Sequence, residues 1–104
     1  MITKLIYKIF THEEWKNFQR KNFFFNSLDA KSGFVHLSTK KQVEGTIKKY
    51  FFDQSILVLV SFKLADLKKN LKWEISRDGN LFPHFYGTLD IKKVYNFKII
   101  RQSL

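Results

Sequence analysis

The segment Ser55–Phe62, SILVLVSF, restricts the fold of this chain more than any other stretch of its sequence. It is apolar at nearly every position and partly β-branched, which is typical of a central strand covered on both faces. A strand of this kind needs packing partners on both sides. We therefore expect a sheet with helices packed against it.

The length and the apolar content favour one domain over residues 1–104. A chain of 104 residues is too short for two ordinary cores. Hydrophobic residues make up 44% of it, which is enough for a packed interior, and the 12 Phe indicate a core filled with rings.

Local patterns predict the remaining elements. Alternating apolar residues predict strands at 5–10, 33–38, 71–75 and 94–100. Thr11–Glu14 and Thr39–Gln42 have the form of capping boxes and predict helices directly after them. The first helix presents Trp15 and Phe18 inward, and the second carries an apolar stripe of Val43, Ile47, Tyr50 and Phe51.

Less regular segments complete the expected order. We expect a short helix at 64–70, a helical turn at 89–93, and loops at 21–32 and 81–87. The order predicts the α+β class: a single compact domain with a mixed, mostly antiparallel sheet and two to three short helices.

Several classes of protein are excluded by composition. The absence of Cys excludes disulfides, Cys-based zinc sites and thiol nucleophiles, and it fits a reducing compartment. The longest apolar run, 56–60, is far shorter than the ~20 residues of a membrane span. Residues 1–10 read as a strand with internal lysines rather than as a signal peptide. We therefore expect a soluble cytoplasmic protein without a membrane partner.

The net charge of +10 raises the question of a nucleic-acid partner. Of the 19 basic residues, 16 are Lys, and they occur singly or in pairs rather than in a long run. Phe, Ile, Lys and Asn together supply 43 residues, and all four have A/T-rich codons, so codon bias alone can produce this charge. A basic RNA-associated protein remains the weaker alternative, since such a module should interleave exposed aromatic residues with Arg.

His36 and Ser38 form the first candidate site. Period-two geometry places both side chains on one face of the strand, directly before a helix start that favours anions. An imidazole, a hydroxyl and free amides can bind a phosphate or assist proton transfer. The alternative is a buried His36 that donates to a backbone carbonyl with Ser38 as an additional cap. Spacing alone favours that structural alternative.

Two further polar clusters lie later in the chain. Glu74 shares a strand face with Lys72 and Ser76, opposite Trp73. It can form an exposed ion pair with Lys72 or Arg77. Alternatively, its carboxylate orients a ligand hydroxyl or a histidine. His84 and Tyr86 follow Pro83, which stiffens the segment. That segment is either the wall of a pocket or a hydrophobic corner.

Other site types are not supported. His12, His36, Glu74 and His84 lack the spacing of zinc signatures, so we predict no metal site. The chain has no Gly-rich dinucleotide fingerprint, Walker loop or nucleophile elbow.

Taken together, these motifs resemble a known family. The blocks are Ile6–Ile9 with Trp15, Gly33–Thr39, Trp73–Glu74 with Ser76–Arg77, and Leu81–Gly87. In this order and approximate spacing, over nearly the whole chain, they resemble a family of small bacterial and plant proteins catalogued as domain of unknown function 952.

The resemblance implies a fold and a ligand class. The family is thought to look like ADP-ribosyltransferases and RNA 2′-phosphotransferases, in which a split sheet holds NAD or a related nucleotide. His36–Ser38 is similar to a nucleotide-contacting segment of the phosphotransferase branch, and Glu74 and His84 would be further cleft residues. No complete catalytic triad of either branch can be placed on this chain.

The leading hypothesis is therefore a pocket for an NAD- or ADP-ribose-type nucleotide, in a possible transferase or hydrolase. The candidate catalytic residues are Glu74, His36 and His84, and the candidate ligand-binding residues are Ser38, Arg77, Tyr86 and Trp73. Tyr86 or Trp73 would offer a stacking surface. The alternative is a non-catalytic module that uses the same pocket for a small metabolite or a peptide.

Overall fold

The computed structural model describes residues 4–25, 33–76 and 79–104. The elements follow the chain as β1 Leu5–Thr11, α1 His12–Lys21, β2 Phe23–Phe24, β3 Val35–His36, α3 Lys40–Tyr50, β4 Ile56–Lys63, α4 Leu64–Leu67, a 3-10 helix Lys68–Asn70, β5 Leu71–Ile75, β6 Leu81–Phe85, β7 Leu89–Asp90, a 3-10 helix Ile91–Lys93 and β8 Val94–Arg101. The α+β class and the compact single domain are confirmed, with a radius of gyration of 13.1 Å.

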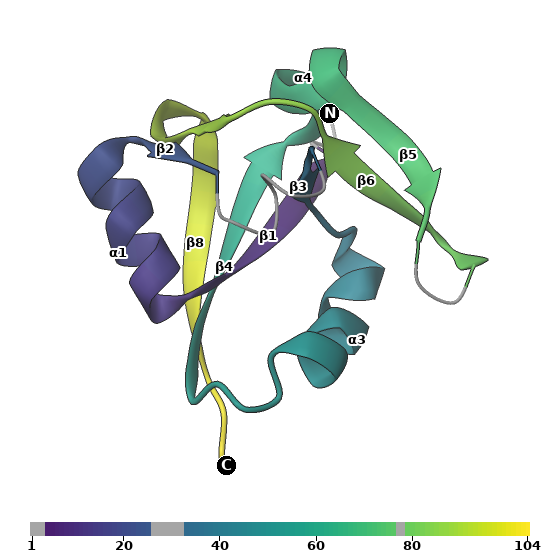
Figure 1. Ribbon diagram of the computed structural model, residues 1–104. Coiled ribbons are helices and arrows are strands. Elements are labelled where there is room, and N and C mark those ends of the chain that lie inside the picture. The colour runs from purple at the N-terminus through teal and green to yellow at the C-terminus, as the bar shows by residue number, and fades with distance from the viewer. Residues whose placement is uncertain (1–3, 26–32, 77–78) are drawn as a thin grey trace.

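The strands form three small sheets, ordered β1-β4-β8, β2-β7 and β3-β6-β5. All strand pairs among the described residues are antiparallel, so the expectation of a mixed sheet is wrong. Between the first and third sheets, Tyr7 and Ser38 form an isolated bridge, with backbone hydrogen bonds of 2.8 and 2.9 Å. The two sheets therefore lie side by side, with β5 and β6 to the right of β1 in Figure 1.

Strand β4 is central in its sheet, as its apolar sequence predicts. Its even-numbered side chains Val58, Val60 and Phe62 are fully buried in the main core. They share this core with rings from β1, α1 and β2, with Phe10 5.4 Å from Phe18 and 4.7 Å from Phe24 between ring centroids. The expected core of aromatic rings is present.

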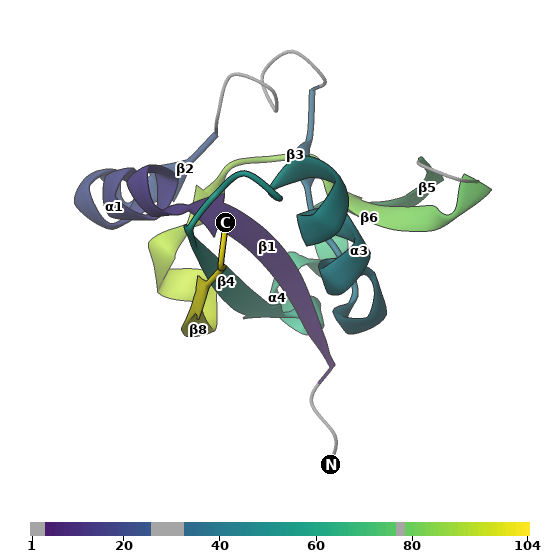
Figure 2. The ribbon, with the colours of Figure 1, turned by 90° about the horizontal axis from the view of Figure 1, so that it is seen from below.

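Helices α1 and α3 cover opposite faces of the sheet β1-β4-β8 (Figures 1 and 2). Trp15 and Phe18 of α1 pack on the Phe10 side, whereas Val43 and Ile47 of α3 lie over the face that carries Tyr7. The capping box of α1 forms as predicted, with Glu14 N–H donating to Thr11 Oγ1 and Thr11 N–H donating to Glu14 Oε1.

Two expected loops contain strands. In 21–32, Phe23 and Phe24 pair with Asp90 and Leu89, and residues 26–32 lie outside the described part of the chain. In 81–87, β6 runs between β3 and β5. Pro83 is tolerated there because it faces the very short β3: its carbonyl accepts the Leu37 N–H at 3.2 Å, and its missing N–H costs only the one reciprocal bond to Leu37.

The remaining differences concern boundaries. The predicted strand 33–38 is regular only over Val35–His36, because Ser38 leaves it to pair with Tyr7 of β1. The helix predicted at 64–70 divides into α4 and a 3-10 turn. The predicted helical turn at 89–93 begins with the two residues of β7. In the described part of the chain, no helix is long and apolar enough to cross a membrane.

Candidate functional site

Strand register gathers the polar candidates on one face of the sheet β3-β6-β5. His36 of β3 lies opposite His84 of β6, and Lys72 of β5 lies opposite His84 on its other side. Glu74 follows Lys72 by two residues and therefore shares its face. The ring centroids of His36 and His84 are 5.7 Å apart. These residues, from three separate parts of the sequence, form what we call the polar face: Phe34, His36, Lys72, Glu74, His84 and Tyr86.

Glu74 is the centre of the hydrogen bonds on the polar face. Its Oε1 accepts from the Tyr86 hydroxyl at 2.6 Å and lies 2.9 Å from Nδ1 of His84. Within the described residues both contacts involve Oε1, and Oε2 accepts none. The Glu74 side chain is 39% exposed, whereas that of His84 is 6% exposed. The carboxylate is therefore held from the buried side and open on the other.

These hydrogen bonds shift two acid–base equilibria in opposite directions. The Tyr86 hydroxyl and then the His84 ring lower the pKa of Glu74, because both contacts favour the ionised carboxylate, and Lys72 adds a smaller attraction. The same bond raises the pKa of Tyr86, since the phenol loses a strong acceptor when it ionises. At neutral pH the pair is a fixed carboxylate and a neutral phenol.

Aromatic rings support the two histidines. Phe34 stacks on His84 with centroids 3.9 Å apart and planes 18° apart, and it lies 4.7 Å from His36. It also meets Tyr86 at 5.5 Å. Sequence reasoning missed Phe34 as a site residue, although its period-two relation to His36 and Ser38 was visible. Phe34 restricts how both imidazoles can turn.

Lys72 was considered only as an ion-pair partner of Glu74. Its Nζ lies 4.9 Å from the centroid of the Tyr86 ring, a cation–π distance. Lys72 and Phe34 thus both contact the Tyr86 ring, which limits its use as a stacking surface for a ligand. Tyr86 is better suited to position Glu74.

Two sequence candidates, Ser38 and Trp73, are not joined to this network. Ser38 is buried against α3, with its Oγ 3.5 Å from Thr46 Oγ1, so this hydroxyl has a structural partner. Trp73 projects from the opposite face of β5, opposite Pro83 in register, and is 46% exposed. Arg77 lies outside the described residues.

The helix start after Ser38 is partly satisfied from within the chain. Gln42 Oε1 accepts the Thr39 N–H at 3.0 Å, and Gln42 Nε2 donates to the Leu81 carbonyl at 2.7 Å. The side chain of Gln42 therefore ties α3 to β6 and helps to fix the two histidine strands. Within the described ranges no group of three or more His, Cys, Asp or Glu is arranged to hold a metal ion.

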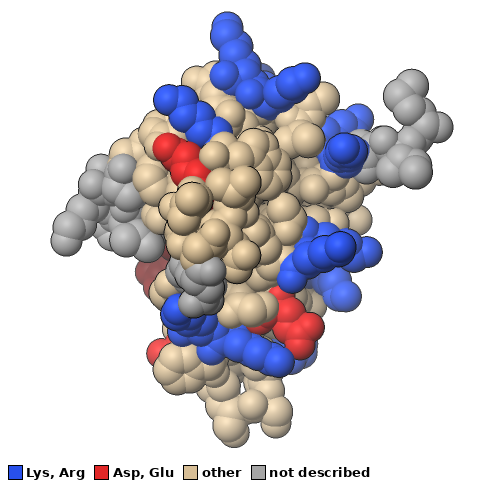
Figure 3. Space-filling view, turned by 90° about the vertical axis from the view of Figure 1, so that its right-hand side faces the viewer, with Lys and Arg blue, Asp and Glu red and all other residues tan. Residues whose placement is uncertain are grey.

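Basic side chains on the side of the molecule that carries β5 and α3 gather in several separate groups around an uncharged area (Figure 3). On α3, Lys48 Nζ lies 3.2 Å from Glu44 Oε1. On this side the basic residues form separate groups and not one continuous basic patch. A protein that binds a nucleic-acid backbone usually has a continuous positively charged groove.

The polar face combines groups that suit a hydroxyl-rich ligand. Oε2 of Glu74 can accept a hydrogen bond from a hydroxyl, and a fixed carboxylate can stabilise positive charge that develops on a sugar carbon. The neighbouring imidazole of His36 can contact a hydroxyl or a phosphate. The arrangement fits binding of a sugar-containing anion and, with a suitable leaving group, cleavage at its anomeric carbon.

Comparisons with known proteins show that most of this chain is similar to one protein family and to solved structures. The model of a family described as protein of unknown function DUF952 matches residues 9–97. The crystal structure of protein CC0527 from Caulobacter crescentus is 38% identical, covers 91% of this chain and 84% of that chain, and has a TM-score of 0.85. Its solution NMR structure is 38% identical, covers 90% and 82%, and has a TM-score of 0.80. Among curated proteins, no match is found.

Proposed function

We propose that this chain, which belongs to the DUF952 family, binds an NAD- or ADP-ribose-type nucleotide on its polar face and acts on the ribose through Glu74. The observation that carries the proposal is the Glu74 carboxylate, fixed through Oε1 by Tyr86 and His84 with Oε2 left for a ligand. We also propose that the two sheets joined at the Tyr7–Ser38 bridge form the split sheet of the ADP-ribosyltransferase-like fold.

The roles of the residues follow from their positions. Glu74 accepts a hydrogen bond from a ribose hydroxyl and stabilises the oxocarbenium-like charge at C1′ as the bond to nicotinamide breaks. His36 contacts a ribose hydroxyl or a phosphate. His84 and Tyr86 are positioning residues, because they hold Glu74 and need not touch the ligand.

The reaction in its simplest form is hydrolysis. The C1′–N bond of NAD breaks, neutral nicotinamide leaves with the bonding electrons, and water adds to C1′ to give ADP-ribose and a proton. A transferase would replace water by another nucleophile at the same carbon. Both reactions require Glu74 to stabilise the positive charge that develops at C1′.

The proposal is tested by ligand-dependent melting and by nicotinamide release. A ligand at a hundredfold its dissociation constant stabilises the wild type by about 2.7 kcal/mol. His36→Ala should remove this stabilisation, and Glu74→Gln should abolish nicotinamide release measured by chromatography. Glu44→Gln is the matched control, since Glu44 lies on α3 with an 82% exposed side chain and should change neither measurement.

The outcomes separate the alternatives. Stabilisation by NAD without nicotinamide release would favour the non-catalytic module that uses the same face. If neither NAD nor ADP-ribose changes the melting temperature of the wild type, the nucleotide proposal is wrong. A large loss of stability in His36→Ala without ligand would identify His36 as a structural residue, with a cost of roughly 2–4 kcal/mol.

A further inference from the structure

Strand β8 has one backbone edge without a partner strand in the described part of the chain. It is the last strand in the order β1-β4-β8 and pairs along its length with β4. Every side chain from Tyr95 to Ile99 is exposed. A long exposed edge of this kind is a template to which another extended segment can add.

The hydrogen bonds show which backbone groups face outward. Phe97 N–H donates to its neighbour's side chain, Asn96 Oδ1, at 2.9 Å, whereas the Asn96 carbonyl faces β4 and accepts from Ser61 Oγ at 3.2 Å. In an antiparallel pair, successive residues alternate between the two edges. Ile99 and Arg101 therefore present their N–H and C=O groups outward together with Phe97.

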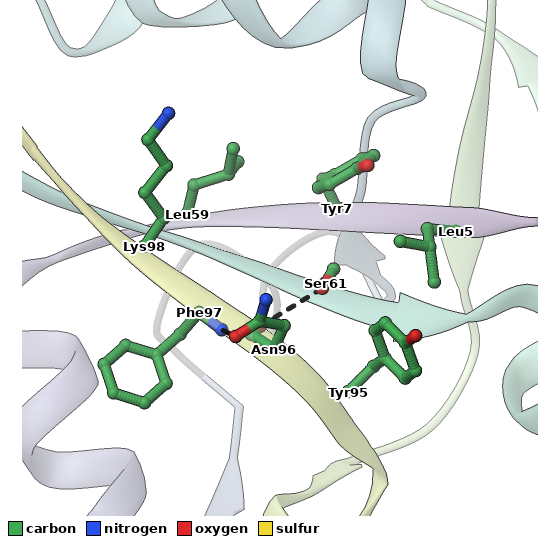
Figure 4. Close-up of a pocket in the computed structure, with 8 residues that line it drawn as sticks. All are labelled: Leu5, Tyr7, Leu59, Ser61, Tyr95, Asn96, Phe97 and Lys98. Atoms are coloured by element: carbon green, nitrogen blue, oxygen red, sulfur yellow. Dashed lines mark hydrogen bonds between the residues drawn. The ribbon is translucent and has the colours of Figure 1, made fainter.

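The side chains of β8 differ between its two faces. Phe97 and Ile99 share one face and are each 49% exposed, and the Phe97 ring lies 5.0 Å from the Trp15 ring. Lys98 projects to the opposite face, as Figure 4 shows. There a hollow of about 230 Å³ extends over Tyr7 and Leu59. One face of an added strand would meet apolar groups, and the other would meet a cation.

The charge of this end of the chain selects the partner. Residues 91–104 contain Lys92, Lys93, Lys98 and Arg101 and no Asp or Glu. A second copy would bring the same cations against each other, with a net charge of +10 on each chain. Lys98 opposes such self-pairing by charge repulsion.

We infer that β8 binds an extended, acidic segment of another protein as an additional antiparallel strand. Backbone hydrogen bonds to the Phe97 carbonyl and to the N–H and C=O groups of Ile99 and Arg101 would provide affinity. Cross-strand neighbours share a face, so the segment would alternate apolar residues opposite Phe97 and Ile99 with acidic residues opposite Lys98. This surface is separate from the polar face, and the inference does not depend on the proposed nucleotide.

The probe is an acetylated, amidated peptide in which Val and Glu alternate over eight positions. We expect saturable binding by calorimetry, weakened by salt because exposed charges contribute. The control peptide replaces each Glu by Lys and keeps the alternation. It should bind at least about tenfold more weakly, which is a difference of about 1.4 kcal/mol.

Four variants, of which Ile99→Ala is a control, test the backbone contacts and the charge. Ile99→Pro removes an outward N–H without removing a bond to β4, so this variant should fold. Ile99→Ala is its control, because it keeps that N–H. Ile99→Pro should bind the Glu peptide at least about tenfold more weakly than Ile99→Ala. Asn96→Ala exposes the Phe97 N–H and should tighten binding. Lys98→Glu should bind the Lys peptide more tightly than the Glu peptide. This variant serves as the test if Ile99→Pro lowers the melting temperature.

Each outcome decides the inference. Absence of saturable binding of the Glu peptide up to about 1 mM would overturn it. Equal binding by Ile99→Pro and Ile99→Ala would overturn the added strand, and equal binding of both peptides would overturn the acidic partner. Sedimentation that shows a concentration-dependent dimer, abolished by Ile99→Pro, would replace the acidic segment by a second copy.

Discussion

The Tyr86 hydroxyl, directly after β6, donates to Oε1 of Glu74 in the neighbouring strand β5 across 2.6 Å. Of the causes that lower the pKa of Glu74, this hydrogen bond is the largest. It joins two residues that are far apart in the chain, and it fixes the orientation of the carboxylate on the polar face. Because the bond shifts the pKa of both Glu74 and Tyr86, variants that lack one of the two side chains can test it by titration.

Tyr86→Phe should raise the pKa of Glu74 toward its ordinary value, because the hydrogen bond that favours the carboxylate is lost. A residual shift in the same direction should remain from His84. The measurement is a ¹³C NMR titration of the Glu74 side-chain carboxyl in both proteins. Unchanged titration in the variant would contradict the role of Tyr86.

The pH dependence of stability follows from the same shift. The pKa of the Glu74 carboxyl is lower in the folded than in the unfolded state. Such a group stabilises the fold at pH values above its pKa in the unfolded state. This contribution is lost as the pH falls through its pKa in the folded state. The difference in melting temperature between wild type and Glu74→Gln should therefore shrink as the pH falls below about 4. A difference that grows on acidification would contradict the lowered pKa.

Tyr86 should respond at the alkaline end. Its pKa is raised by the bond to Glu74, so its contribution to stability is present below the unfolded phenol pKa and is lost as pH rises through the folded one. Glu74→Gln should lower the pKa of Tyr86, which ultraviolet titration against Tyr86→Phe would reveal. An unaltered titration would mean that the two side chains are not coupled in solution.

Phe34→Ala should destabilise the domain by about 1–3 kcal/mol, because it removes a half-buried ring that stacks on His84 and contacts His36. Urea unfolding monitored by fluorescence measures this change. Phe52→Ala is the control, since Phe52 is 66% exposed and its loss should cost less than about 0.5 kcal/mol. Similar costs for both variants would show that the stacked ring contributes little.

Phe10→Ala should have the largest effect. Phe10 is fully buried and contacts the rings of Trp15, Phe18 and Phe24, so truncation leaves a cavity in the centre of the aromatic core. The expected cost is about 3–5 kcal/mol, a large fraction of the stability of a domain of this size. Calorimetric melting that drops by only a degree or two would contradict the assignment of this core.

Local sequence patterns predicted the elements that depend on neighbours in the chain. Thr11 and Glu14 cap a helix through bonds between residues three apart, and the alternation of residues 5–10 gives a strand with a buried Phe10. The strand β6 was missed because Pro83 argued for a loop, and only the short β3 beside it makes this proline acceptable.

The side-chain types on the polar face were also visible in the sequence. His36, Glu74, His84 and Tyr86 were selected for their chemistry, and alternation placed Glu74 opposite Trp73 across the strand. Their roles as ligand-binding or catalytic groups remain predictions. The role of Ser38 as a ligand group is less favoured, because its hydroxyl lies against Thr46.

The sequence by itself determined where most helices and strands begin, which faces are apolar, and which residues can carry chemistry, since these properties depend on periodicities of a few residues. The tertiary structure decided that His36 lies opposite His84, that Glu74 Oε1 meets both His84 and Tyr86, and that Tyr7 and Ser38 join two sheets. These contacts depend on strand order and register. A shift of one residue would reverse every face, and local periodicity does not encode which strand pairs with which.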